Sequence, residues 1–70
     1  MITNIELIKK DIYKLINDEK DVITRRYSLF IDEIEQLTNK HDIFIWLNNN
    51  SYLFSKYAAA DIKNIFYKLK

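Results

Sequence analysis

The chain has 70 residues, a formal net charge of +1, and no glycine, proline or cysteine. Without cysteine it forms neither a disulfide framework nor a thiolate zinc site. Without glycine it lacks the phosphate-binding loops and the nucleophile elbow, which need glycine where the backbone meets a phosphate or turns sharply. The near-zero net charge argues against strong electrostatic binding to nucleic acid. We expect one small domain, residues 1–70, held by apolar packing, with no cofactor and no metal.

Because glycine and proline are absent, we expect turns at Asn, Asp and Ser. These residues cluster at 17–18, 39–42 and 48–51 and divide the chain into four segments. The first segment, about residues 4–17, is predicted to be a helix, because Thr3 and Glu6 fit a capping box and the apolar residues recur at helical spacing. The residues of this apolar stripe are Ile5, Ile8, Ile12, Leu15 and Ile16.

The second segment, about residues 21–39, is predicted to be the longest helix. Asp21 and Arg25 form a favourable pair one turn apart. The apolar face of this helix comprises Ile23, Tyr27, Phe30, Ile31, Ile34, Leu37 and Thr38.

The third segment, residues 42–48, contains the β-prone run 43–47, so a short buried strand is an alternative to a short helix. We favour the helix, because a single strand would leave its backbone groups unpaired. The fourth segment, about residues 51–69, is predicted to be a helix with Phe54, Ala58, Ile62, Ile65, Phe66 and Leu69 along one side. Helices joined by short polar breaks must bury their apolar stripes against each other, so we predict an all-α fold, a compact three- to four-helix bundle.

Apolar residues outside the core stripes are candidate partner-binding residues. On a helical wheel, Leu53, Tyr57 and Tyr67 lie together, roughly 140° from the stripe of the fourth segment. Val22 and Leu29 form a second off-stripe patch. The alternative is that the fourth helix is central and buried on both sides. If the first patch mediates self-association, Tyr57→Asp should convert a dimer into a monomer.

Trp46, the single tryptophan, has two interpretations. It anchors the short third helix to the core, or it forms an aromatic hot spot with Phe44 and Tyr52 beside the Asn-rich turn. We include Trp46 among the candidate partner-binding residues.

Catalysis is not expected. His41 and Asp42 have no serine or cysteine nucleophile paired with them, and a hydrolytic triad needs a third group and an oxyanion hole. Asp32, Glu33 and Glu35 are interpreted as a solvated helix face. We therefore predict that the protein is not an enzyme.

An alternative function is a small DNA-binding regulator. Arg25, Arg26, Lys56 and Lys63 are candidate phosphate contacts, and a helix-turn-helix can be drawn from the third and fourth segments. The usual small turn residue is absent, however, and no base-reading set is evident. Nucleic acid therefore ranks below protein as the expected partner.

The Ile-, Lys- and Asn-rich helices resemble small phage and plasmid accessory proteins, and also bacteriocin immunity proteins, which are helical bundles from low-GC bacteria. The composition indicates an AT-rich gene. No apolar run is long enough for a membrane span or a signal peptide, so we expect no membrane partner and a cytoplasmic location, bacterial or in an infected host cell. The leading hypothesis is a protein-protein interaction module, an inhibitor or accessory regulator of a phage, plasmid or virus, with a homodimer as one form. An immunity-type protein is a second alternative.

Overall fold

The structure, a computed structural model, describes residues 4–70. Its helices are α1 (Asn4–Asp18), α2 (Lys20–Ile23), α3 (Arg26–Gln36), α4 (Lys40–Asn50) and α5 (Ala59–Lys68), with the 3₁₀ turns η1 (Ser51–Leu53) and η2 (Lys56–Ala58) between α4 and α5. This part of the chain contains no strand, so the predicted all-α fold is confirmed. The capping residue Thr3 lies outside the described residues.

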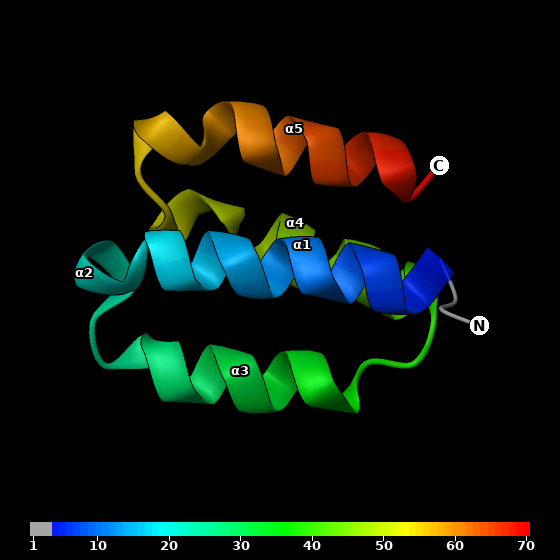
Figure 1. Ribbon diagram of the computed structural model, residues 1–70, viewed down its shortest axis with the longest axis horizontal. Coiled ribbons are helices and arrows are strands. Elements are labelled where there is room, and N and C mark those ends of the chain that lie inside the picture. Colours follow the sequence, from blue (N-terminus) through cyan, green and yellow to red (C-terminus); the bar gives the residue numbers. More distant parts are fainter. Residues whose placement is uncertain (1–3) are drawn as a thin grey trace.

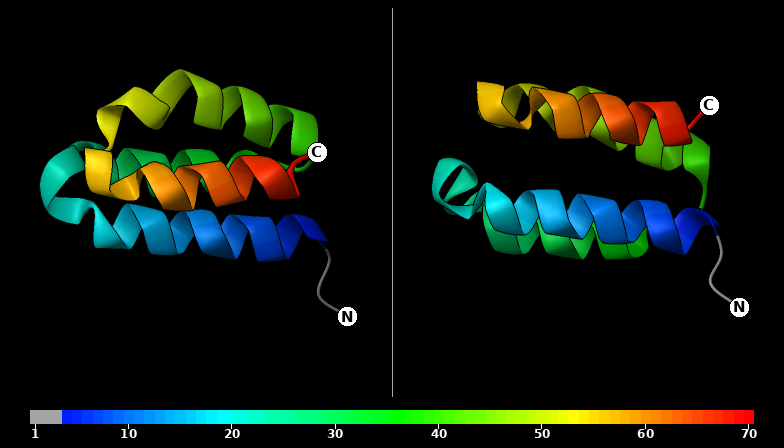
Figure 2. Two further views of the ribbon diagram at one scale, coloured as in Figure 1. Left: turned by 90° about the horizontal axis from the view of Figure 1, so that it is seen from above. Right: turned by 45° about the horizontal axis from the view of Figure 1, so that its top comes forward.

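The four longer helices run side by side in alternating directions (Figure 1). Seen from above, α5 lies between α1 and α4, while α3 lies beneath (Figure 2). Helix α1 packs directly against both α3 and α5. The result is an up-down-up-down four-helix bundle of 32 × 23 × 21 Å. The short α2 closes the end at which α1 turns back into α3.

The predicted stripes form the core. Every helix contributes buried side chains, and the centroid of the Phe30 ring lies 5.1 Å from that of Trp46 and 5.9 Å from that of Phe54. The buried core residues are Ile8, Ile12, Leu15, Ile16, Ile23, Phe30, Ile34, Ile43, Trp46, Leu47, Phe54, Ala58 and Ile65.

The single helix predicted over residues 21–39 is wrong. The chain breaks after Ile23, because Thr24 adopts φ 50° and ψ −112°, and α3 then ends at Gln36. The break turns the chain across the end of the bundle and leaves Ile23 only 1% exposed. Three β-branched residues in succession, at 22–24, also weaken the helix at this point. Burial of Ile23 therefore overrides the continuous helical pattern.

The helix predicted over residues 51–69 begins at Ala59 instead. Between the two 3₁₀ turns, Phe54 and Ser55 are extended, with ψ values of 159° and 165°. The extended pair lets Phe54 enter the core, where it is 8% exposed. The Ser55 backbone N–H donates to Glu19 Oε1 at 2.6 Å, which ties this break to the junction between α1 and α2.

The third segment is a helix, as favoured over a strand, and it is longer than the predicted 42–48. Asn39 caps α4, because its Oδ1 accepts a hydrogen bond from the Asp42 backbone N–H at 2.9 Å. Its Nδ2 donates to Asp42 Oδ2 at 2.9 Å. This reciprocal cap explains why α4 begins at Lys40.

Candidate functional site

The patch predicted from Leu53, Tyr57 and Tyr67 is not assembled. The helical wheel requires one continuous helix, and the extended break at Phe54 and Ser55 interrupts it. Leu53 is half-buried against the core. Tyr57 is 83% exposed and Tyr67 62% exposed. They lie in η2 and near the end of α5, at opposite ends of the bundle (Figure 1).

Trp46 is the core anchor of α4 and is only 7% exposed. Its indole Nε1–H donates to Glu33 Oε1 at 3.1 Å, and its ring meets Phe30 edge-on. This placement agrees with the first interpretation of Trp46 and removes it from the accessible surface. Glu33, expected in a solvated face, is instead half-buried as the acceptor of this hydrogen bond.

The Glu33–Trp46 hydrogen bond identifies the facing sides of α3 and α4. Arg26 and Leu29 lie seven and four residues before Glu33, so they share its side of α3. On α4, Asp42 lies one turn before Trp46, and Ile45 lies next to it toward solvent. We call this surface, which lies over the buried Trp46, the α3–α4 face; it includes Arg26, Leu29, Glu33, Asp42 and Ile45.

Apolar side chains are exposed at the middle of the α3–α4 face. Leu29 is 55% exposed and Ile45 43% exposed, above the buried Trp46. Phe44, 46% exposed, lies beside Ile45 and contacts Phe66 of α5, with ring centroids 5.5 Å apart. Residues 43–55 contain no charged side chain. Helix α4 therefore exposes Phe44 and Ile45 to solvent in addition to the apolar side chains that it buries.

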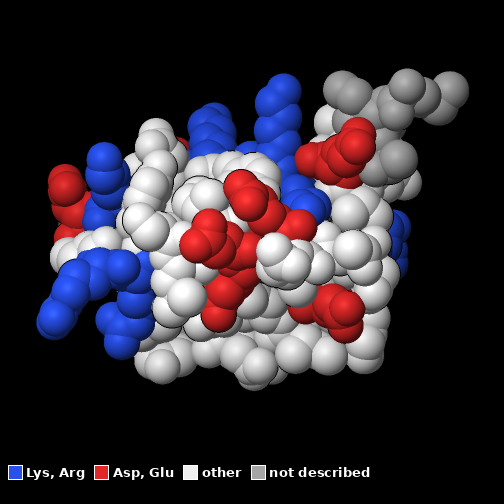
Figure 3. Space-filling model, turned by 90° about the horizontal axis from the view of Figure 1, so that it is seen from below, with Lys and Arg blue, Asp and Glu red and all other residues white. Residues whose placement is uncertain are grey.

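The α3–α4 face carries Glu33 near its middle and Arg26 and Asp42 toward its ends. Arg26 begins α3 and Asp42 lies in the first turn of α4. Because α3 and α4 are antiparallel, these two residues lie at opposite ends of the bundle (Figure 1). On the side that shows α3, basic side chains gather at the left end, with acidic ones in the middle and to the right (Figure 3). Among residues 4–70, neither Arg26 nor Asp42 belongs to an ion pair.

Ile45 is the residue that the helical-wheel reasoning missed. The predicted third segment is only about two turns long, so its sequence does not separate a buried side from an exposed side. The uncharged run 43–55 could have indicated it. A helix in a small bundle buries only one of its sides, so some apolar residues of such a run must face solvent. Val22 is also exposed, at 47%, on α2 near the end of the bundle.

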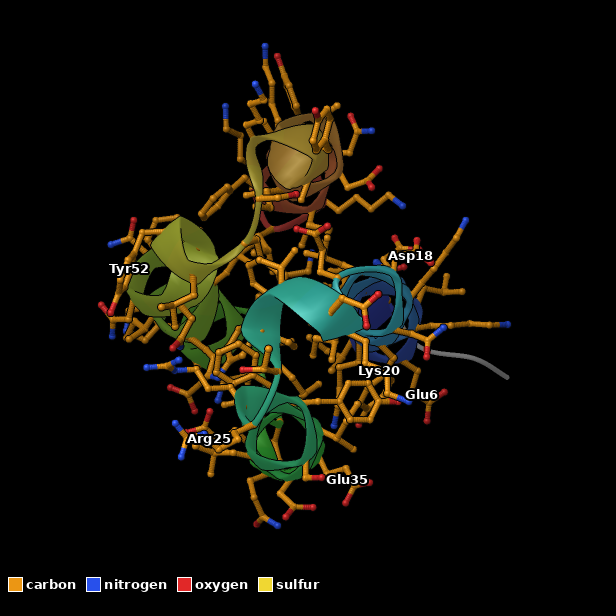
Figure 4. All side chains as sticks on the ribbon, turned by 90° about the vertical axis from the view of Figure 1, so that its left-hand side faces the viewer. Glu6, Asp18, Lys20, Arg25, Glu35 and Tyr52 are labelled. Carbon is orange, nitrogen blue, oxygen red and sulfur yellow. The ribbon has the colours of Figure 1, made fainter. Side chains whose placement is uncertain are left out.

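The four candidate phosphate-binding residues do not form one surface. Arg25 and Arg26 lie at the start of α3, whereas Lys56 and Lys63 lie on η2 and α5. Figure 4 shows Arg25 beside α3 at one corner of the bundle and α5 at the opposite corner. Helices α4 and α5 are antiparallel and joined by residues 51–58. They therefore differ from the helix-turn-helix of the alternative DNA-binding hypothesis, which needs a short turn and a steep crossing angle.

A polar hollow of 170 Å³ lies between α1 and α5, lined by residues that include Asp18 and Asp61. The ion pair of Lys68 Nζ with Asp11 Oδ2 spans these two helices. Within residues 4–70, no group of three His, Cys, Asp or Glu side chains is suited to a metal ion. On the far side of α1, burial and, second, the Glu35 carboxylate raise the pKa of the Tyr13 hydroxyl above its usual value.

Comparison with protein-family models, with curated proteins and with solved structures gave no match to this chain. None of the described helices has the length and apolar character needed to cross a membrane.

Proposed function

We propose that this protein is a protein-binding module and that its contact surface is the α3–α4 face. The exposure of Ile45 and Leu29 above the buried Trp46 carries the proposal. Exposed apolar side chains with polar and charged side chains around them are typical of protein interfaces. Full burial of a Leu or Ile side chain contributes roughly 1.5–3 kcal/mol. Covering these two half-exposed residues therefore contributes about 2 kcal/mol.

The cellular role that fits this surface is that of an inhibitor or accessory regulator encoded by a phage, plasmid or virus and acting in the cytoplasm. The small size and the AT-rich composition support it. An immunity-type protein is one instance of the same role, because it also acts by covering a partner protein. Catalysis is not part of this proposal.

The competing proposal is DNA binding through Arg25, Arg26, Lys56 and Lys63. The separation of these residues onto different corners of the bundle weakens it. Retention on heparin distinguishes the two proposals, because phosphate binding by several basic residues falls steeply with salt. We expect elution at low salt, and retention that persists to high salt would support the DNA-binding regulator.

The proposal is tested by capture experiments with the immobilised protein in a lysate of the cell that produces it. We expect Ile45→Asp to abolish capture, since it puts a charge at the centre of the α3–α4 face. Leu7→Asp is the matched control, because Leu7 is 47% exposed but lies on α1. It should capture the same protein as the wild type, whether a second copy or another chain.

Equal capture by the wild type and by Ile45→Asp would show that the binding surface lies elsewhere. Circular dichroism of both variants should match that of the wild type, and this control would exclude unfolding as the cause of a loss.

A further inference from the structure

We infer that the outward side of α5 binds single-stranded nucleic acid, with lysine ammonium groups on the phosphates and tyrosine rings stacked on the bases. We call this surface the α5 outer face, which consists of Lys56, Tyr57, Lys63, Tyr67 and Lys70. It is separate from the α3–α4 face, so the inference goes beyond the proposed function and is independent of it.

One helical stretch brings these residues to the same side of the bundle. After the extended pair 54–55, η2 runs directly into α5. Lys63 and Lys70 are seven residues apart, about two helical turns, and Tyr67 lies between them on the same side. Lys56 and Tyr57 continue this side through η2, and all five side chains are exposed. Figure 4 shows nitrogen-tipped side chains that extend from α5 away from the other helices.

The positive charge of the chain is concentrated in this part of the molecule. Residues 51–70 contain four lysines and one acidic residue, Asp61, whereas residues 1–50 contain seven basic and nine acidic residues. Asp61 lines the hollow toward α1, and Lys68 pairs with Asp11 across the same two helices. Within residues 4–70, the three lysines of the α5 outer face form no ion pair. They therefore favour an anionic partner.

An exposed tyrosine ring accompanies the lysine at each end of the α5 outer face. Lys56 Nζ lies 5.5 Å from the centroid of the Tyr57 ring, and Lys70 Nζ lies 4.9 Å from that of Tyr67. The rings are accessible, because Tyr57 is 83% and Tyr67 62% exposed. An ammonium group beside an accessible ring matches a nucleotide, in which an anionic phosphate is joined to a base with a flat face.

The tyrosine rings favour a single strand over a duplex. Bases of a duplex stack on each other, whereas those of a single strand can stack on aromatic side chains. Ten residues separate Tyr57 from Tyr67, which corresponds to about 15 Å along a helix axis. A few nucleotides of an extended strand cover this distance, with the lysines along their phosphates.

Other anionic partners fit the α5 outer face less well. A helix that lies on a bilayer inserts large apolar side chains into it. Those of α5, Ile62, Ile65 and Phe66, pack instead against the core of the bundle. An acidic peptide would pair with the lysines but would not need the two rings. Nucleic acid uses both kinds of side chain.

The first experiment measures fluorescence anisotropy of a labelled oligothymidylate of about eight nucleotides with the whole chain at low salt. We expect saturable binding. Tyr57→Ala and Tyr67→Ala should each weaken it about fivefold or more, through the loss of one stacked base. Tyr52→Ala is the matched control, because Tyr52 is 79% exposed but lies on η1 and should leave the affinity unchanged. Circular dichroism checks that the variants remain folded.

The second experiment repeats the titration at rising salt concentration. Three lysine–phosphate contacts predict that the logarithm of the binding constant falls against that of the salt concentration with a slope of about −2. Lys63→Gln should make this slope shallower by about 0.7. Lys10→Gln, on α1, should leave it unchanged. So few contacts also agree with elution from heparin at low salt.

Several results would overturn the inference. These are a wild type that does not bind oligothymidylate, binding that both tyrosine variants leave unchanged, and equal affinity for a hairpin duplex. Binding to phosphatidylserine vesicles or to polyglutamate in place of the oligonucleotide would assign the α5 outer face to another anionic partner. Ile45→Asp should bind the oligonucleotide like the wild type, so a failure of this inference is distinguishable from a failure of the proposed function.

Discussion

At the scale of single residues, Thr24 shows the cost of the break between α2 and α3. It has φ 50° and is the one residue with positive φ in the described part of a chain without glycine. A β-branched residue in this region is strained by contacts between its side chain and the backbone, at a cost of about 1–3 kcal/mol. The strain persists because burial of Ile23 and the start of α3 require the turn at this position.

We therefore predict that Thr24→Gly stabilises the protein. Glycine relieves the strain but adds conformational entropy to the unfolded chain, so the net gain is about 1 kcal/mol. For a chain of this size the melting temperature should rise by about 5 °C. Thr38→Gly is the control, because Thr38 has no positive φ and the substitution should only destabilise. A lower melting temperature for Thr24→Gly would show that the turn is not strained.

At the scale of elements, a contact from α1 sets the end of α3. Lys9 Nζ donates to the backbone carbonyls of Glu35 at 3.2 Å and Leu37 at 3.0 Å. These carbonyls lie at the C-terminal end of α3, where a cation satisfies free acceptors and the negative end of the helix dipole. The prediction of a helix to residue 39 failed here because the capping cation lies 26 and 28 residues away in the chain.

We predict that Lys9→Met destabilises the protein by about 1 kcal/mol, because methionine keeps the apolar stem but donates no hydrogen bond. Lys10→Met is the matched control, since Lys10 is exposed on the same helix and should change stability by less than about 0.5 kcal/mol. Urea unfolding followed by Trp46 fluorescence measures both. Equal losses in the two variants would exclude a specific cap by Lys9.

At the scale of the whole molecule, one hydrogen bond joins the α1–α2 corner to the segment before α5. Glu19 Oε1 accepts from the Ser55 backbone N–H at 2.6 Å, across 36 residues of sequence. Residues 51–58 would otherwise be held mainly by Phe54 and Ala58 in the core. The Glu19–Ser55 hydrogen bond and the burial of Phe54 and Ala58 together hold the segment that leads into α5.

We predict that Glu19→Ala loosens the packing of α5 on the bundle. Hydrogen exchange of amides in residues 55–68 should accelerate by about tenfold, which corresponds to the loss of about 1.4 kcal/mol of local stability. Amides of α3 should change less. Glu19→Gln keeps an acceptor oxygen and should give an intermediate effect, whereas uniform acceleration throughout the chain would mean that Glu19 supports global rather than local stability.

The local pattern of apolar and polar residues was sufficient to predict the all-α class of the fold. The stripe from Ile8 to Ile16 predicted α1 because helical spacing is a property of neighbouring residues. The polar cluster around Asn39 likewise marked the start of α4, where the cap forms between residues three apart. Composition alone excluded disulfides and glycine-dependent phosphate loops. These properties depend on short stretches of chain and need no knowledge of the other helices.

The broken helices and the α3–α4 face depend on packing between distant segments. Thr24 turns because Ile23 is buried at the end of the bundle, and Ser55 is extended because Phe54 and Glu19 hold its neighbourhood. Trp46 is buried and Ile45 is exposed because α3 packs beside α4 on the Trp46 side. A helical wheel shows which residues share a side of one helix. Which side meets a neighbour, and which is left for a partner, follows only once all four helices are in place.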